Sequence, residues 1–224
     1  MHFNPNVVSL SRGVFQTLVI LIIGSIPARA QLNFGFTGGV AGSVTGEGVA
    51  DFSETKFSPS RTYGASAGYR FSNGLTLAAR AEQFQMGLRE NGASLGTLRM
   101  KPILFSVGYQ GLPSEGRRIT GHVQFGAGMA LTDFEKGSVL TDMESAYGAR
   151  LNILTSHAPI FEFGGGLDYF FSRYVSFTSD FRILFSNVGT QWSAVGYRTV
   201  EMPDIETFLA SNGQAQVGIR FWLK

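Results

Sequence analysis

The sequence of 224 residues has no cysteine, few lysines and no long apolar run after residue 30. Without cysteine, the chain has neither a disulfide framework nor a thiolate metal site. Its only lysines are Lys56, Lys101, Lys136 and Lys224. A water-soluble all-β protein usually keeps its outer face wet with Lys and Glu, so this scarcity argues against one. A transmembrane helix needs roughly 20 apolar residues, and residues 31–224 contain no such run.

The first thirty residues have the pattern of a cleaved signal peptide. Arg12 gives a basic start, residues 14–23 form an apolar run, and an Ala-Arg-Ala sequence at 28–30 offers a cleavage site before Gln31. The alternative, a membrane-spanning helix, needs a longer run. No cysteine follows the cleavage point, so nothing supports a lipid-anchored N-terminus. We therefore expect an exported chain whose mature domain is residues 31–224.

Cleavage would leave the mature domain without net charge. The whole chain has 18 basic and 16 acidic residues, but Arg12 and Arg29 lie in the signal segment and no acidic residue does. The remaining charges balance, and they include no cluster of Lys and Arg. The sequence therefore gives no support for a nucleic-acid partner.

Period-two alternation of apolar and polar residues predicts eight strands in the mature domain. They cover about residues 32–45, 61–71, 75–82, 98–110, 119–131, 160–170, 175–185 and 214–223, and the third pattern blurs at 83–88. The connections alternate between short and long, the long ones being about 46–60, 87–97, 132–159 and 186–213. Short periplasmic turns and longer external loops are typical of an up-and-down outer-membrane barrel. The expected fold is all-β: an eight-stranded antiparallel transmembrane β-barrel with four long external loops.

Periodicity alone leaves open which face of the strands points inward. In the stretch VSFTSDFRILF, at 175–185, one face is nearly all apolar and the other carries Asp180 and Arg182. A lipocalin-type calyx would put the apolar face inside, and a membrane barrel would put it outside. The polar face consists mostly of Gly, Ser and Thr with equal numbers of acids and arginines, which suits a cramped interior in which the charges pair.

This composition predicts a structural network of ion pairs in the lumen of a membrane barrel. Its predicted members are Arg70, Arg80, Glu82, Glu162, Asp168, Asp180, Arg182 and Arg220.

The run GGGLDYFFSRYVSFTSDFRILF, at 164–185, resembles the penultimate hairpin of small outer-membrane β-barrels such as the OmpA transmembrane domain, OmpX and OmpW. The resemblance covers the architecture of the whole mature chain. It implies an eight-stranded barrel with an interior charge cluster, which Arg80, Glu82, Asp180 and Arg182 would match. It also implies a Gram-negative outer membrane, both termini in the periplasm, and outer-membrane lipids, lipopolysaccharide and the barrel insertion machinery as partners.

The last strand departs from this family. Its members commonly end on an aromatic residue that the insertion machinery recognises, whereas here Phe221 is followed by Trp222, Leu223 and Lys224. The alternation of apolar residues continues through Leu223, so we still expect insertion.

Histidine chemistry receives little support from the sequence. Some small barrels of this membrane are enzymes that modify lipid A with a His, a Ser and an acid. The mature chain has two histidines, His122 on the interior face of a strand and His157 at the end of a loop, and no local spacing of Ser and acid accompanies either. A lone interior His is more often a satisfied structural residue than a catalytic base. We therefore expect no enzyme activity, no cofactor and no metal site.

The expected function is a structural or surface-interaction role carried by the external loops. Trp192 and Tyr197 are possible contact residues there, and the spacing of polar residues predicts short helices starting near Thr141 and Pro203. The first alternative, implied by the OmpW resemblance, is a narrow conduit or binding site for small apolar compounds. The second is an enzyme that modifies lipid A. An eight-stranded interior is only wide enough for its own side chains, which argues against a general porin.

Overall fold

The computed structural model describes residues 31–46, 56–90, 93–112, 118–148, 150–195, 200–201 and 206–223. Within these ranges it describes the side chains except at 43–46, 56–57, 90, 190–195, 200–201 and 206–210.

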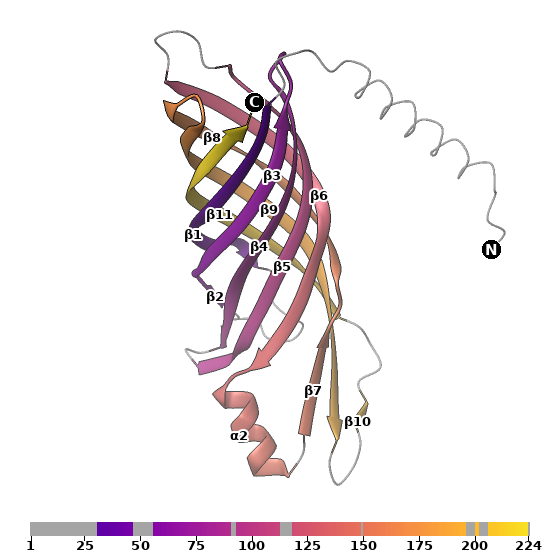
Figure 1. The fold of residues 1–224 in the computed structure, drawn as a ribbon. Helices are drawn as coiled ribbons and strands as arrows, with labels where there is room; N and C mark the ends of the chain where they lie inside the picture. Colours follow the sequence, from indigo (N-terminus) through magenta and orange to yellow (C-terminus); the bar gives the residue numbers. More distant parts are fainter. Residues whose placement is uncertain are drawn as a thin grey trace, which may run out of the picture.

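Eight long strands form a closed antiparallel barrel (Figure 1). Around the barrel the order is β9–β11–β1–β3–β4–β5–β6–β8, and the pairing of β8 with β9 closes the ring. This confirms the predicted fold class. The strands are β1 (Gln31–Gly46), β3 (Ser60–Arg70), β4 (Leu75–Glu90), β5 (Ala93–Gln110), β6 (Ile119–Lys136), β8 (Ala158–Ser172), β9 (Val175–Val195) and β11 (Glu206–Leu223).

The two ends of the barrel differ. At one end, which we call the turn end, lie short turns, the start of β1 and the end of β11, where Leu32 pairs with Leu223. The turn between β3 and β4 contains Ser72, Asn73 and Gly74: Gly74 has a φ of 90°, which glycine adopts without strain, and its N–H donates to the Phe71 carbonyl at 3.0 Å. At the other end, which we call the loop end, lie the helix α2 (Ser138–Tyr147) and three short strands, β2 (Lys56–Ser58), β7 (Arg150–Thr155) and β10 (Val200–Glu201) (Figure 1).

The strands run further toward the loop end than the sequence pattern predicts. The second expected loop, at about 87–97, is almost entirely strand, because β4 and β5 stay paired until Glu90 meets Ala93. β6 likewise continues to Lys136 and β9 to Val195. On β4 and β6 the alternation continues into these extensions. There the face that carries the polar residues changes, and a scan for one constant phase reads the change as a loop.

The helix predicted near Thr141 is present, but its start was wrong. α2 begins at Ser138, after Gly137, and the Thr141 hydroxyl donates back to the Gly137 carbonyl at 3.0 Å instead of capping the helix. Glu144 fixes the helix to the barrel, since it accepts hydrogen bonds from Lys136 Nζ and from the Leu151 N–H, both at 2.6 Å. The second predicted helix start, at 203–205, lies outside the described residues, and β11 begins at Glu206.

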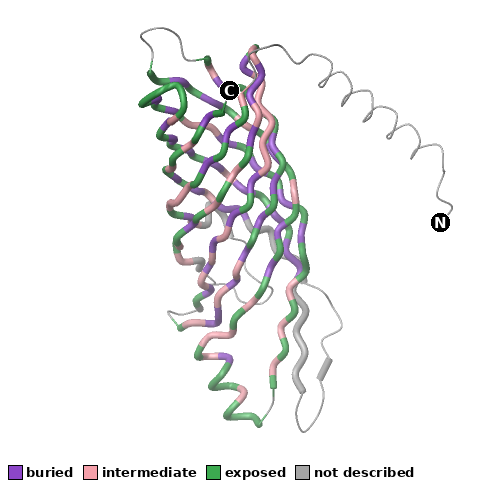
Figure 2. The backbone as a smooth tube through the Cα atoms, in the orientation of Figure 1, coloured by how far each residue is buried: buried purple, intermediate pink, exposed green. Residues whose placement is uncertain are grey.

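Along most of the barrel wall, buried and exposed residues alternate (Figure 2). Large apolar side chains cover much of the outer wall, among them Phe36, Phe105, Phe125, Phe163 and Phe181, each more than half exposed. The inward face near the turn end carries the buried polar and charged residues. The apolar face is therefore outside, as the composition of the polar face predicted. No helix in the described part of the chain is long and apolar enough to cross a membrane.

Candidate functional site

The barrel interior is filled by three successive layers of side chains. Nearest the turn end is an aromatic layer around Trp222, next comes a charged layer, and nearest the loop end is an apolar layer. Seven of the eight predicted network residues lie in the charged layer. The exception is Arg70, which lies in the aromatic layer.

Two arginines and two glutamates form the centre of the charged layer, and we call them the arginine–glutamate cluster: Arg80, Glu82, Glu162 and Arg182. Arg182 donates from Nη2 to Glu82 Oε1 at 2.6 Å and from Nη1 to Glu162 Oε2 at 3.1 Å. Arg80 lies at 3.6 Å from Glu82 and 3.4 Å from Glu162. None of these residues is more than 5% exposed. Removing one partner of such a buried set typically costs about 3–5 kcal/mol, because it leaves a charge unpaired.

Glycines on neighbouring strands make room for this cluster. A Cβ at Gly164 would lie 2.4 Å from Arg182 Cγ, and one at Gly126 would lie 2.7 Å from Glu162 Oε1. A Cβ at Gly64 would lie 2.8 Å from Glu82 Cγ. These three inward-facing glycines are therefore needed for the packing of the lumen, because each leaves space for a long charged side chain on the adjacent strand.

A second polar centre forms around His122. Its Nδ1 lies 2.9 Å from Asp168 Oδ2, and its Nε2 lies 2.5 Å from Asp180 Oδ1. Arg220 and Gln110 also donate to Asp168, at 3.1 and 2.8 Å. The charge of Asp180 acts on Arg80 and Arg182, but its hydrogen-bond partner is the histidine on β6.

This arrangement occupies both ring nitrogens of His122. Two carboxylate oxygens face the ring from opposite sides, and both contacts are hydrogen bonds when each ring nitrogen carries a proton. The ring therefore presents no free nitrogen to a substrate. The described residues contain no group of His, Cys, Asp and Glu side chains placed to hold a metal ion.

Arg70 forms no direct ion pair with a described residue, and Asp168 acts on it only through its charge. It donates to the side-chain oxygen of Gln31, and its guanidinium lies over the Trp222 ring at 4.3 Å. Trp222 is 1% exposed and donates from Nε1 to Ser176 Oγ at 2.9 Å. The departure at the end of the last strand thus has a local structural role, because Trp222 points inward and packs beside Phe170 to fill the turn end.

The apolar layer was not predicted. It consists of Ala41, Phe84, Met86, Leu88, Leu95, Leu98, Met100, Leu104, Ala130, Ala158, Ile160, Leu184 and Val188, all at most 5% exposed. Its signal in the sequence was the blurred pattern at 83–88. There β4 continues its alternation with Phe84 and Met86 inward and Gln83 and Gln85 outward. A search for period two that allowed the polar face to change would have found it.

The polar part of the lumen contains a small cavity between described side chains. A cavity of about 30 Å³ lies beside His122, between Asn33, Thr76, Arg80 and Arg220. Such a volume holds roughly one or two water molecules. The predicted loop contacts cannot be placed among these layers: the side chain of Trp192 and the whole of Tyr197 lie outside the described residues.

No family model matches the sequence, and no curated protein matches it either. Solved structures do. The outer membrane protein OprG from Pseudomonas aeruginosa is similar with a TM-score of 0.58 at 12% identity, over 85% of this chain and 95% of that one. Neisserial surface protein A, at 11% identity, has a TM-score of 0.48 over 86% of this chain and 96% of that one. AlkL, at 16% identity, has a TM-score of 0.43 over 88% and 95%.

The closed ring of eight strands and the match to OprG define the class: the chain has the fold of the small outer-membrane β-barrels. This is the fold of the family that the sequence resembles. At 12% identity the likeness shows the fold alone.

Proposed function

We propose that this protein is a non-enzymatic outer-membrane barrel that acts at the cell surface through its loop end, with both termini in the periplasm. The observation that carries this proposal is the filled interior. The arginine–glutamate cluster and the apolar layer together occupy the lumen with side chains that are at most 5% exposed. A filled barrel offers partners a surface rather than a passage.

The loop end provides such a surface. α2 and β7 extend beyond the ring of strands (Figure 1) and present Met143, Tyr147 and Leu154, which are 45%, 76% and 65% exposed. Met and Tyr are enriched where proteins contact partners. His122, the interior candidate for a catalytic base, has both nitrogens engaged by carboxylates, which supports a non-enzymatic role.

Orientation is tested by labelling from outside the cell. Because the chain has no cysteine, Ala146→Cys on α2 and Asn73→Cys in the first turn each introduce one thiol. We expect a membrane-impermeant thiol reagent to label Ala146→Cys on intact cells and Asn73→Cys only after the outer membrane is permeabilised. Labelling of Asn73→Cys alone on intact cells would invert the orientation.

The surface role is tested by complementation. In a deletion strain, a variant with residues 138–148 replaced by a short Gly-Ser linker should insert as a barrel but fail to restore the phenotype. A variant with Arg118→Gln at the turn end serves as control and should restore it. Full complementation by the shortened variant, or stable conductance of the wild type in planar bilayers, would contradict the proposal.

A second candidate is the binding of small apolar compounds at the loop end. The apolar layer favours it, because it includes Met86 and Met100, and methionine side chains adapt readily to irregular apolar ligands. Under this reading, wild-type protein should bind an apolar fluorophore, and Met86→Gln with Met100→Gln should abolish binding. Unchanged binding in that variant would remove this candidate.

A further inference from the structure

The small cavity beside His122 is enclosed by side chains that donate hydrogen bonds. Its walls come from β1, β3, β4, β5, β6 and β11, and two of its lining side chains are the guanidinium groups of Arg80 and Arg220. The neutral polar residues that line it are Asn33, Ser66, Thr76, Gln110 and Gln124. Side-chain amides and hydroxyls each have an N–H or O–H to donate. The cavity is therefore suited to a ligand that accepts hydrogen bonds.

The described carboxylates of the lumen do not line this cavity. β8 and β9 contribute nothing to its walls, and these strands carry Glu162, Asp168 and Asp180. The remaining carboxylate of the charged layer, Glu82, is absent from the lining and bonds Arg182. The described lining therefore consists of positive and neutral groups, an environment that favours an anion over a cation.

The two arginines of the cavity are only partly neutralised by their carboxylate partners. Arg80 lies 3.6 Å from Glu82 and 3.4 Å from Glu162, whereas a charge-assisted hydrogen bond of this kind is typically about 2.7–2.9 Å long. Arg220 bonds Asp168 through Nη1, at 3.1 and 3.2 Å, and two other side chains contact the same carboxylate. Both guanidinium groups therefore retain charge that a further anion would stabilise.

The charges of the lumen are also unequal in number. The carboxylates of the charged and aromatic layers are Glu82, Glu162, Asp168 and Asp180. The cations there are Arg70, Arg80, Arg182, Arg220 and, when both ring nitrogens carry a proton, His122. Among the described residues of these layers, the cations then exceed the carboxylates by one. A single bound anion of charge −1 would restore neutrality.

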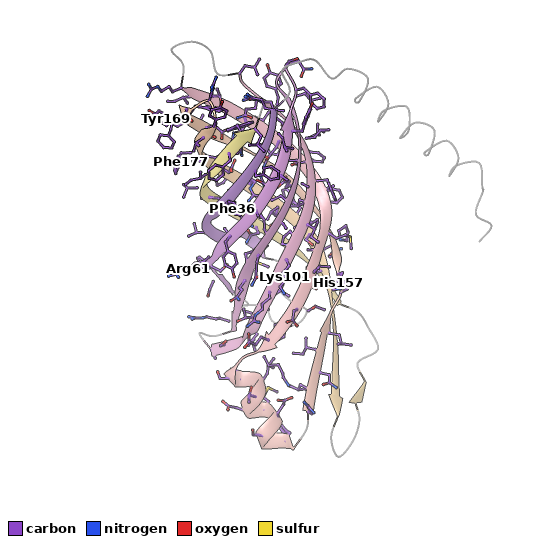
Figure 3. All side chains as sticks on the ribbon, viewed as in Figure 1. Phe36, Arg61, Lys101, His157, Tyr169 and Phe177 are labelled. Carbon is purple, nitrogen blue, oxygen red and sulfur yellow. The ribbon has the colours of Figure 1, made fainter. Side chains whose placement is uncertain are left out.

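The wall around the cavity makes an uncompensated charge costly. Ile219, which precedes Arg220 on β11, pairs with Phe36 on one side and with Phe177 on the other. Figure 3 shows both phenylalanines in the half of the barrel nearer the turn end. An apolar wall gives the lumen a low effective dielectric constant, in which a charge without a partner is strongly destabilising.

We propose that this cavity is a binding site for one small monovalent anion, chloride under ordinary conditions. Its volume of about 30 Å³ holds one ion of that size in place of water and is too small for sulfate or phosphate. The ion would accept hydrogen bonds from Arg80 and Arg220 and from the hydroxyls of Ser66 and Thr76. Arg220, whose side chain is 11% exposed, is the most exposed cation of the lining, so exchange with solvent would take place beside it.

The first test removes hydrogen-bond donors and leaves every charge in place. Ser66→Ala with Thr76→Val removes two hydroxyls from the cavity. Thr120→Val with Thr178→Val is the matched control, because both threonines are buried and neither lines the cavity. Chloride binding to each purified protein in neutral detergent is measured from the line width of the chloride NMR signal, which broadens when chloride exchanges with a protein site. A heat-dependent shift in gel mobility establishes that each barrel is folded.

The second test removes one positive charge. Arg220→Gln takes it from the cavity, while Asp168 keeps its contacts with Gln110 and His122. Arg118→Gln takes it from the exposed turn end and serves as control. The first test stands by itself if Arg220→Gln does not fold.

We expect the wild type to broaden the chloride signal, bromide to remove this broadening, and sulfate at equal ionic strength to leave it unchanged. Each cavity variant should bind chloride at least about tenfold more weakly, because hydrogen bonds to a charged group are among the stronger ones. Both controls should keep wild-type affinity. In crystals soaked with bromide, an anomalous density peak should lie between Arg80 and Arg220.

A wild type without excess broadening, or without the bromide peak, would show that the cavity holds water only and would overturn the proposal. Unchanged binding in the cavity variants, equal losses in the controls, or displacement by sulfate would overturn it too. None of these measurements depends on the proposed surface role or on which end of the barrel faces outward.

Discussion

Loss of Arg182 should be among the most destabilising single changes in the lumen. Its side chain is fully buried and bonds Glu82 at 2.6 Å and Glu162 at 3.1 Å. In Arg182→Met the chain length is kept, but two buried carboxylates are left to share Arg80, which lies at 3.6 and 3.4 Å from them. We expect the free energy of unfolding to fall by about 3–5 kcal/mol.

The assay is reversible urea unfolding of the barrel in lipid vesicles, followed by tryptophan fluorescence and by gel mobility. Arg99→Met is the matched control, because it breaks the exposed pair of Arg99 with Glu135, and such surface pairs contribute about 0–1 kcal/mol. Adding Glu82→Gln to Arg182→Met should recover part of the loss, since it removes one uncompensated charge. A loss no larger than that of the control would refute the view that the cluster is a mutually dependent set of buried ions.

Three further predictions follow from other contacts. Gly164→Ala places a Cβ 2.4 Å from Arg182 Cγ and 2.6 Å from the Phe181 carbonyl oxygen, so it should lower the urea midpoint by an amount equivalent to about 1–3 kcal/mol. Gly42→Ala, whose Cβ would meet nothing within 4 Å, should leave the midpoint unchanged, and equal effects would contradict the space-making role of Gly164. Trp222→Ala should lower the free energy of unfolding by about 3–5 kcal/mol in the same assay, because it removes the buried ring on which Arg70 lies. A smaller loss than that of Phe221→Ala, on the outer face, would argue against a structural role for the Trp222 ring. The hydrogen bond from Lys136 lowers the pKa of Glu144 below its ordinary value of 4.5, so the tether of α2 should be complete above that value and lost as pH falls through the lowered pKa. The protection of the Leu151 amide, measured against its intrinsic exchange rate at each pH, should then fall in acid in the wild type and be low at every pH in Glu144→Ala, whereas pH-independent protection in the wild type would count against the tether.

The sequence alone predicts the barrel because polar and apolar residues alternate along its strands. Inward Asp180 and Arg182 alternate with outward Phe181 and Ile183, and a period of two fixes both the strand and its faces. The equal numbers of acids and arginines then indicate which face is inside. These are local properties, so they can be read without knowing which strands are neighbours.

The pairing of individual side chains inside the lumen could not be predicted from the sequence in the same way. Arg182 bonds Glu82, which is 100 positions away, and His122 on β6 contacts Asp168 on β8 and Asp180 on β9, which are 46 and 58 positions away. Such pairings depend on strand stagger and on the room left by glycines such as Gly164. Arg70 was therefore assigned to the ion pairs although Trp222 is its neighbour.

The apolar layer escaped prediction for a different reason. The alternation at 83–88 is intact, but the outward residues change from apolar to polar there and the inward residues change from charged to apolar. A rule that assigns the polar residues to one face along the whole strand misses this exchange.

The most direct test of the account is the environment of outward positions along β5. Single cysteines at Thr97, Arg99, Lys101, Ile103, Phe105 and Val107, each carrying a nitroxide label in reconstituted protein, report collision with oxygen, which concentrates in lipid, and with a water-soluble nickel complex. The account predicts high oxygen accessibility at 103, 105 and 107, high nickel accessibility at 97 and 99, and the crossover at 101. Nickel accessibility at all six positions, or no crossover, would contradict a barrel whose wall passes from lipid to water near Lys101.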